Sequence, residues 1–327
     1  MTQRIAVTAG DPRGIGPEII IKALADPRVG GRSDLVLVGP TGCGLDVDES
    51  IGEWTSGGDA ALAGKLSGLA IERATAMAMN GNVDGIVTAP IDKSALLAGG
   101  YDFPGHTEML AHLTHSKVAM MLAAVRGGGE GAPNPLRVVL ATTHVALRDV
   151  PLVLTEATIV DAARITRDYL SMWFGILEPR IALCALNPHA GDGGRFGNED
   201  AELLAPAARK AGIAGPFPAD TVFVRAMKGA FDAVIAPYHD VGMTAIKVAS
   251  FGGAVNVTLG LPFPRTSPDH GTALDIAGKG VADPSSFIEA LLLCRRLAAL
   301  ARSSDGRPSN EDRPQGYRSS ARPSTSP

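Results

Sequence analysis

Cysteine is scarce in this chain of 327 residues, and the few cysteines present are poorly placed for two common structural roles. Cys43, Cys184 and Cys294 are odd in number and far apart, and no two of them form a Cys-X-X-Cys motif. This distribution argues against a disulfide framework and against a thiolate zinc site, and it favours a reducing compartment.

An excess of positive charge and long apolar runs are also missing. The formal net charge of −4 gives no reason to expect nucleic acid as a partner. No apolar run reaches the length of a membrane helix, and the first residues enter a strand pattern without the basic segment and apolar stretch of a signal peptide. We therefore expect a cytoplasmic protein with no nucleic-acid and no membrane partner.

What the chain does contain is an alternation of strand-like and helix-like patterns. Short apolar runs alternate with helical stripes through most of the sequence, with strands expected at 4–10, 34–39, 83–90 and 254–260 and helices at 17–25, 69–82, 153–170 and 285–302. Residues 40–63 are rich in Gly and Asp and are expected to form a loop. The alternation predicts an α/β fold with a mostly parallel sheet covered by helices on both faces, and a closed barrel is the alternative.

The length of the chain favours two domains. We place a first, discontinuous α/β domain at residues 1–105 plus 265–302 and a second at 106–264, two open sheets that face each other across a cleft. Residues 127–135 are expected to be a flexible excursion. Residues 303–327, rich in Ser, Pro and Arg, are expected to be a disordered tail because they offer almost no apolar surface to bury.

Three histidines stand just past the ends of apolar strand-like runs. His144 follows RVVLATT, His189 follows RIALCALNP and His239 follows DAVIAPY. In an open α/β sheet, ligands collect where strands deliver their carboxyl ends. A single such histidine is more often a core or capped residue, but the repetition predicts a metal site with an open position for substrate.

Two segments offer groups for a small anion. GDPRGIGPE at 10–18 follows a strand and precedes a helix, so it is either an anion-binding loop or a tight structural turn. PGHTEML at 104–110 places His106 and Thr107 just before a helix, where imidazole, hydroxyl and free backbone donors converge. The alternative role for Thr107 is that of helix N-cap, with Glu108 in the first turn.

A third segment adds two cations and an amide close to His239. YHDVGMTAIK supplies Lys247, and Asn256 and Arg265 follow it. Lysine and arginine on loops are usually solvated, but here they lie in otherwise apolar sequence punctuated by Pro and Gly. We therefore predict a clamp for a doubly charged group such as a phosphate monoester.

SPDHGTALDIAGKG at 267–280 is the most specific string in the chain. It is similar to the nucleotide-binding loop of isopropylmalate and isocitrate dehydrogenases, which bind NAD or NADP without a Rossmann fingerprint. Small residues let the backbone approach an adenosine while His and Asp offer hydrogen bonds. The residues that this similarity assigns to the cofactor are His270, Gly271, Thr272, Ala273 and Asp275.

Residues 4–300 as a whole resemble the 4-hydroxythreonine-4-phosphate dehydrogenase family of pyridoxal phosphate biosynthesis. The resemblance is carried by TAGDPRGIGPE, TAPIDKS, PGHTE, TTHVALRDVP, LNPHAGDGGRFGNED, PADTVF, YHDVGMTAIK and VNVTLGLPFPRTSPDHGTALDIAG. Dehydrogenases of 4-phospho-D-threonate and 4-phospho-D-erythronate share the same pattern and are the alternative.

The resemblance implies a fold, an assembly and a site. The fold is like that of isopropylmalate dehydrogenase, and the protein works as a homodimer whose metal sites draw on both subunits. The implied metal ligands are His144, His189 and His239, holding zinc, magnesium, cobalt or manganese. The implied substrate contacts are His106, Thr107, Lys247, Asn256 and Arg265.

The same resemblance implies an oxidation with NAD, or with NADP. The hydroxyl of 4-phosphooxy-L-threonine is oxidised to give a β-keto acid, which loses CO₂ to give 3-amino-2-oxopropyl phosphate. For catalysis we single out Asp220, Asp240 and Lys247; either aspartate is a candidate proton acceptor or a partner that orients a histidine. The rival hypotheses are a metal-dependent phosphosugar hydrolase or aldolase and a non-catalytic phosphometabolite-binding protein.

Overall fold

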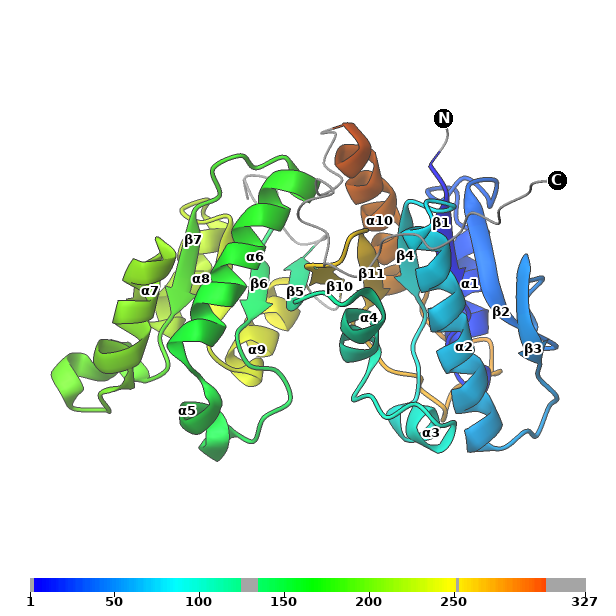
Figure 1. Ribbon diagram of the computed structural model, residues 1–327, viewed down its shortest axis with the longest axis horizontal. Helices are drawn as coiled ribbons and strands as arrows, with labels where there is room; N and C mark the ends of the chain where they lie inside the picture. Colours follow the sequence, from blue (N-terminus) through cyan, green and yellow to red (C-terminus); the bar gives the residue numbers. More distant parts are fainter. Residues whose placement is uncertain (1–2, 125–134, 251–252, 304–327) are drawn as a thin grey trace, which may run out of the picture.

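The computed structural model describes residues 3–124, 135–250 and 253–303 (Figure 1). The expected tail, apart from Ser303, and most of the segment at 127–135 lie outside these residues. Among the described helices, none is long and apolar enough to cross a membrane.

One sheet of eleven strands forms the centre of the molecule, and its order is β3-β2-β1-β4-β11-β10-β5-β6-β9-β7-β8. The strands are β1 (Ile5–Thr8), β2 (Leu35–Thr41), β3 (Glu49–Glu53), β4 (Gly85–Thr88), β5 (Ala119–Ala124), β6 (Arg137–Leu140), β7 (Ile181–Cys184), β8 (Ala214–Phe217), β9 (Ala233–Ala236), β10 (Ala254–Leu259) and β11 (Arg265–Pro268). The α/β prediction is confirmed. The barrel alternative is wrong, because the described strands form an open row with β3 and β8 at its ends.

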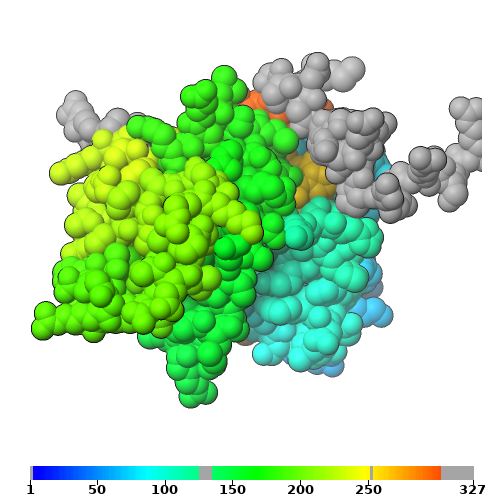
Figure 2. Space-filling view, turned by 60° about the vertical axis from the view of Figure 1, so that its left-hand side comes forward, coloured from blue at the N-terminus to red at the C-terminus, as the bar shows by residue number. Residues whose placement is uncertain are grey.

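The sheet has two parallel halves joined by antiparallel strands. β3, β2, β1, β4 and β11 run parallel to one another, and so do β6, β9, β7 and β8. Between them, β10 is antiparallel to both β11 and β5, and β5 is antiparallel to β6. Two separate sheets were expected, but the two halves form one continuous sheet. Figures 1 and 2 show them as two blocks in contact, blue to cyan and green to yellow.

Helices cover both faces of this sheet. The helices are α1 (Gly16–Leu24), α2 (Ala60–Met79), α3 (Lys93–Ala98), α4 (His106–Thr114), α5 (Val150–Val153), α6 (Glu156–Phe174), α7 (Ala205–Ala211), α8 (Ala219–Met227), α9 (His239–Ser250) and α10 (Ser285–Ser303). Alternate residues of a strand face opposite sides, and β6 shows this: Val139 packs in the cluster that includes α6, and Val138 and Leu140 in the one that includes α8 and α9.

One local expectation needs correction. Residues 40–63 are not one loop, because they contain β3 and the first turn of α2. β3 is a partly exposed edge strand with the sequence ESIGE, so it lacks the apolar run that marks a buried strand. Residues 239–250, which follow a predicted strand, form helix α9. Helix α9 matters for function because His239 begins it and Lys247 lies two turns further on.

Candidate functional site

The three strands that precede the candidate metal ligands are neighbours. β6, β9 and β7 are parallel and adjacent, with Leu140 aligned to Ala236 and Leu183 aligned to Ile235. Their carboxyl ends therefore lie along one edge of the sheet, as the sequence predicts. The segments that carry His144, His239 and His189 all leave the sheet from this edge.

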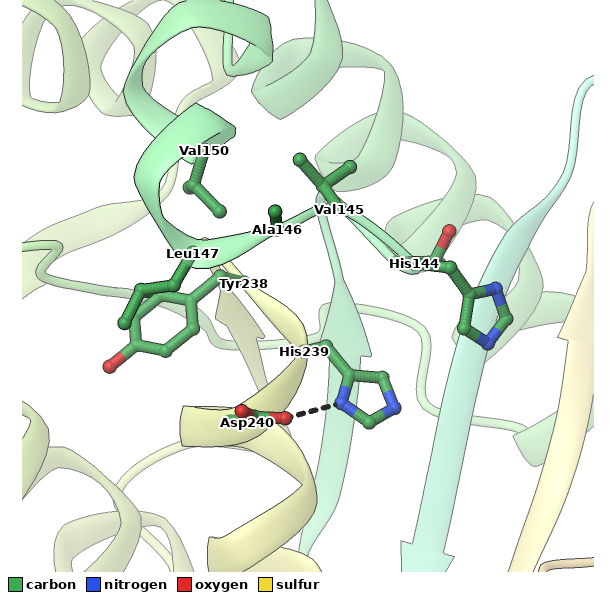
Figure 3. A pocket seen from close by; sticks show the side chains of 9 residues that line it. His144, Val145, Ala146, Leu147, Val150, Tyr238, His239 and Asp240 are labelled. Atoms are coloured by element: carbon green, nitrogen blue, oxygen red, sulfur yellow. Dashed lines mark hydrogen bonds and ion pairs between the residues drawn. The ribbon is translucent and has the colours of Figure 1, made fainter.

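His144 and His239 lie together at this edge. Their ring centroids are 5.8 Å apart. Asp240 Oδ1 lies 2.7 Å from Nδ1 of His239, which fixes the ring and leaves Nε2 for another partner (Figure 3). Burial, and then the positive charge of Lys93, lower the pKa of His144. A neutral imidazole is the form that binds a divalent metal.

The two rings border a cavity of about 220 Å³. Its lining comes from the segments after β6 and β9, and consists of Thr143, His144, Val145, Ala146, Leu147, Val150, Tyr238, His239 and Asp240. Leu147 is 65% exposed although it is a large apolar residue. The part of the lining that Leu147 supplies therefore lies at the molecular surface.

His189 does not join this pair. It lies in the 3-10 segment Pro188–Gly194, where His189 has a φ of 54° and Ala190 a φ of 56°. Both residues are thus in the left-handed region, which residues other than glycine rarely adopt. The His189 ring lies 6.4 Å from that of Phe196, measured between centroids.

The described residues contain no group of three or more His, Cys, Asp or Glu side chains arranged to hold a metal ion. A three-histidine site within a single chain is therefore not formed. A site that takes His144 and His239 from one subunit and His189 from another stays a prediction.

The two candidate aspartates differ in position. Asp240 contacts His239, so its place in the structure fits the orienting role; its side chain is otherwise 83% exposed. Asp220 lies in the first turn of α8, is exposed, and does not line the cavity beside His144 and His239.

A second cluster lies on the central strands. Arg265 is 2% exposed, and its guanidinium donates hydrogen bonds to Thr258 Oγ1 at 3.0 Å and to Thr88 Oγ1 at 2.5 Å. Burial lowers the pKa of Arg265 to about 10, so the group remains a cation at neutral pH. Burial, and then the charge of Arg265, keep the pKa of His106 well below its usual value. His106 is therefore neutral at physiological pH.

This cluster leaves hydrogen-bonding groups without partners. Three buried atoms, His106 Nε2, Asn256 Oδ1 and Arg265 Nε, have no hydrogen-bond partner among the described residues. Buried polar groups in proteins are nearly always paired, and each exception calls for a physical explanation. Asn256 and Thr258 are two residues apart on β10, so their side chains face the same side of the sheet. Thr258 is bonded to Arg265, and Asn256 therefore lies on the same side as Arg265. The unpaired atoms therefore mark a place for a polar ligand.

The helix after Pro104 and Gly105 begins two residues earlier than expected, so His106 and Thr107 lie in its first turn and not before it. α4 starts at His106, and its N-cap is Gly105. The alternative role for Thr107 as N-cap is therefore wrong, while Glu108 does lie in the first turn. Thr107 is 9% exposed and lies in the first turn of the helix, where backbone N–H groups have no partner within the helix. It remains available to bind an anion together with His106.

Lys247 is held by an aspartate that was not among the predicted site residues. Its Nζ donates to Asp269 Oδ2 at 2.8 Å and to the Asp269 carbonyl at 3.2 Å. The ion pair carries no net charge, so the net positive charge of the predicted clamp comes from Arg265. Lys247 is 45% exposed and keeps a proton to offer to a ligand.

The predicted nucleotide loop leaves β11 and crosses the carboxyl ends of the neighbouring parallel strands. Ile15 N donates to Thr272 O at 3.0 Å. An added Cβ at Gly14 would lie 2.8 Å from Thr272 O, so glycine lets the loop approach GDPRG closely. Further on, Lys22 bonds to the carbonyls of Gly280 and Ala282.

A cavity of about 630 Å³ lies beside the far end of this loop. It is lined by residues of GDPRGIGPE, of the β2–β3 region and of the loop itself, among them Arg13, Trp54, Ala277 and Gly278. At the near end, His270 Nε2 is buried without a partner in the described part of the chain. Asp275 is exposed. The loop thus joins the anion cluster to a cavity large enough for part of a cofactor.

Lys93 and Glu108 also belong to the site, although the sequence analysis did not assign them to it. An added Cβ at Gly105 would lie 3.5 Å from Glu108 Oε2 and 3.7 Å from Lys93 Cε. The charges of both residues act on His144, and that of Glu108 acts on Arg265 as well. They lie between the histidine pair and the anion cluster. The signal in the sequence was TAPIDKS, where a lysine follows the end of a strand.

Comparison with known proteins shows the family of this chain. The family described as "Pyridoxal phosphate biosynthetic protein PdxA" matches residues 38–294. The chain is 42% identical to the 4-hydroxythreonine-4-phosphate dehydrogenase of Paracoccus denitrificans, over 90% of this chain and 98% of that one. It is 38% identical to the D-threonate 4-phosphate dehydrogenase of Salmonella typhimurium, over 91% and 99%.

Solved structures show the same relationship. The 4-hydroxythreonine-4-phosphate dehydrogenase of Klebsiella pneumoniae superposes with a TM-score of 0.79 at 37% identity, covering 91% of this chain and 98% of that one. Isocitrate dehydrogenase from Methylococcus capsulatus has a TM-score of 0.50 at 17% identity, covering 93% and 89%, and shares the fold. This chain belongs to the PdxA family.

Proposed function

We propose that the chain is an NAD- or NADP-dependent dehydrogenase of a small hydroxy acid that carries a terminal phosphate. The substrate we propose first is 4-phosphooxy-L-threonine, which would be oxidised to a β-keto acid and decarboxylated to 3-amino-2-oxopropyl phosphate. One observation supports this most: His106, Asn256 and Arg265 each keep a buried polar atom without a partner among the described residues, and a polar ligand would supply the missing partners.

The binding energy of the phosphate would orient the substrate. Arg265 supplies a fixed cation, and its free Nε–H can donate to a phosphate oxygen. His106 is neutral and Thr107 is nearly buried, so both act as short-range hydrogen-bonding groups. Lys247 and Asn256 would complete the contacts. Energy from a group remote from the reacting carbon is well suited to placing that carbon.

A divalent metal fits the histidine pair, because His239 is oriented by Asp240 and His144 is kept neutral. His144 and His239 would hold the ion, and His189 of a second subunit would complete the set. When bound, the ion supplies a Lewis acid that polarises the substrate oxygen. Of the candidate metals, zinc suits imidazole ligands best, and cobalt, manganese and magnesium are the further candidates.

The dinucleotide would lie along the loop that follows β11. Residues 270–275 would contact it, with the unpaired His270 Nε2 as one hydrogen-bonding group, and the cavity bordered by Arg13 and Trp54 would take its far end. When bound, the nicotinamide supplies the hydride acceptor. In an open α/β sheet this edge, at the carboxyl ends of parallel strands, is where ligands bind.

We further propose that the enzyme is a homodimer. Large apolar residues are exposed close to both parts of the candidate metal site: Leu147 and Leu152, at 65% and 80%, follow His144, and Phe196, at 44%, lies beside His189. A second copy would cover this surface and bring the two parts together. The three free cysteines fit a protein that works in the cytoplasm.

Two experiments test the function. Purified enzyme with divalent metal is assayed for reduced cofactor with 4-phosphooxy-L-threonine, 4-phospho-D-threonate and 4-phospho-D-erythronate, each with NAD and with NADP. The D-threonate compound is the second candidate because the Salmonella relative carries that activity in its name. If none of the three acids supports reduction of NAD or of NADP, the proposal is overturned in favour of a hydrolase, an aldolase or a binding protein. Absence of bound divalent metal after purification and repletion would overturn the metal assignment.

A further inference from the structure

Asp269 connects three elements that are far apart in the sequence. Its carboxylate accepts a hydrogen bond from Lys247 in α9, at 2.8 Å. Its backbone N–H donates to the Ser286 hydroxyl in α10 at 3.3 Å, and that hydroxyl also lies 3.4 Å from Asp269 Oδ1 and 3.1 Å from the carbonyl of Ala254 in β10. The Asp269 side chain is 4% exposed and Ser286 is 5% exposed, so the contact between these two residues is shielded from water, whereas Lys247 is 45% exposed.

Asp269 and Ser286 lie at the two ends of the predicted nucleotide loop. Asp269 immediately precedes His270, and Ser286 follows the end of the same loop at the start of α10. The pair Asp269–Ser286 therefore closes the loop at residues 270–280 at its base. The same carboxylate holds the ammonium group of Lys247, which belongs to the substrate side of the site.

We propose that Asp269 is a positioning residue that couples binding of the phosphorylated substrate to binding of the dinucleotide. The inference rests on the proposed function, which gives Lys247 to the substrate and the loop to the cofactor. A substrate oxygen bound to Lys247 fixes its flexible side chain and, through Asp269, the base of the loop. A dinucleotide that orders the loop fixes Asp269 and, through it, Lys247.

This arrangement predicts mutual tightening of the two ligands. Lysine loses considerable side-chain entropy when it is held in one place, and the ligand that binds second is spared part of that loss. Coupling between binding sites is reciprocal, so each ligand must tighten the other by the same factor. The factor expected for an energetic link of this kind is about fivefold or more.

The coupling is measured with ligands that cannot react together. NADH and the unoxidised phosphorylated hydroxy acid form a ternary complex without turnover, because NADH already carries a hydride and cannot accept another from the acid. The Kd of NADH is determined by fluorescence with and without the saturating acid, using whichever acid the wild-type enzyme oxidises. We expect the acid to lower the Kd of NADH about fivefold or more in wild type and about twofold or less in Asp269→Asn.

Three further variants make the result specific. Ser286→Ala loosens the base of the loop without touching Lys247 and is expected to reduce the coupling as well. Lys247→Met is expected to weaken binding of the acid and leave the Kd of NADH alone unchanged. Asp161→Asn is the matched control, since it breaks the solvent-exposed pair of Lys117 and Asp161 at 2.9 Å and should keep the wild-type factor.

The outcomes separate the inference from the proposed function. The inference is overturned, while the proposed function stands, if both Asp269→Asn and Ser286→Ala keep the wild-type coupling. It is also overturned if Lys247→Met binds the acid as tightly as wild type does. A wild-type enzyme that oxidises the acid but shows no coupling overturns it as well. If wild type binds neither ligand, the proposed function fails and the inference fails with it.

Discussion

The guanidinium of Arg265 and the imidazole of His106 share one buried cluster, and each keeps a nitrogen without a partner among the described residues. The two groups come from opposite sides of the proposed domain boundary, since Arg265 begins β11 and His106 begins α4. A buried cation beside a neutral imidazole, both incompletely bonded, is costly for a ligand-free protein. The cost is explained if a phosphate occupies the cluster during the reaction.

Replacing Arg265 should weaken substrate binding selectively. Arg265→Ala removes a charge-assisted hydrogen bond worth about 1.5–3 kcal/mol, so the KM for the phosphorylated acid should rise at least about tenfold. The Kd of NAD should stay within about twofold, because coupling through Lys247 and Asp269 is left intact. Arg265→Lys keeps a charge and fills part of the space, and should give a smaller rise in KM. Equal losses for acid and NAD would contradict the clamp.

Asp240 and Asp220 should behave differently when they are replaced. Asp240→Asn removes the carboxylate that orients His239, so affinity for the divalent metal should fall about 10- to 100-fold, as measured by competition with a chelator. At saturating metal, much of the activity should return. Asp220→Asn should leave metal affinity unchanged. Loss of metal affinity in Asp220→Asn instead of Asp240→Asn would reverse the assignment.

Subunit mixing tests whether the metal site is shared. His189→Ala and His239→Ala should each be inactive. When the two are mixed and allowed to exchange subunits, half of the dimers are mixed and half of their sites are intact, so about a quarter of wild-type activity should appear. A site formed within one chain would recover nothing. Size-exclusion chromatography of each variant shows whether it still forms a dimer.

The state of His106 predicts how stability changes with pH. The pKa of His106 in the folded protein is well below its value of about 6.5 in the unfolded chain. As the pH falls through about 6.5, the unfolded chain therefore takes up a proton at His106 that the folded protein does not. The free energy of unfolding should therefore fall as pH drops from 7.5 to 5.5. His106→Gln removes this contribution, so the shift in Tm between the two pH values should be smaller. An unchanged shift in the variant would show that His106 is not buried as a neutral group.

Much of the fold followed from the sequence because its signals are local. β1, β4, β6, β7 and β9 are short buried runs that stand out as strands, and the terminal helix has a clear apolar stripe. β3 was not predicted because an exposed edge strand such as ESIGE needs no apolar run. The union of the two halves into one sheet depends on the pairing of β10 with β11, which is set by tertiary contacts that a single sequence does not reveal.

The candidate site was predictable to a similar degree. Strand ends correctly placed His144 and His239 near each other, but the left-handed backbone at His189 and Ala190 has no clear sequence signal, and His189 does not join the pair. Asp269 was visible in SPDHGT, yet nothing local indicates that Lys247, 22 residues earlier, is its partner. Such a contact becomes evident only when α9 is packed beside β10.

The central claim is that the enzyme uses the phosphate of a hydroxy acid to direct oxidation of its hydroxyl by a nicotinamide cofactor. The most direct measurement is the rate of NADH formation with 4-phosphooxy-L-threonine and with its dephosphorylated counterpart, each before and after removal of divalent metal. The account predicts NADH formation only with the phosphorylated acid and only with metal present. Comparable rates for the two acids, or a rate that is unaffected by chelation, would contradict it.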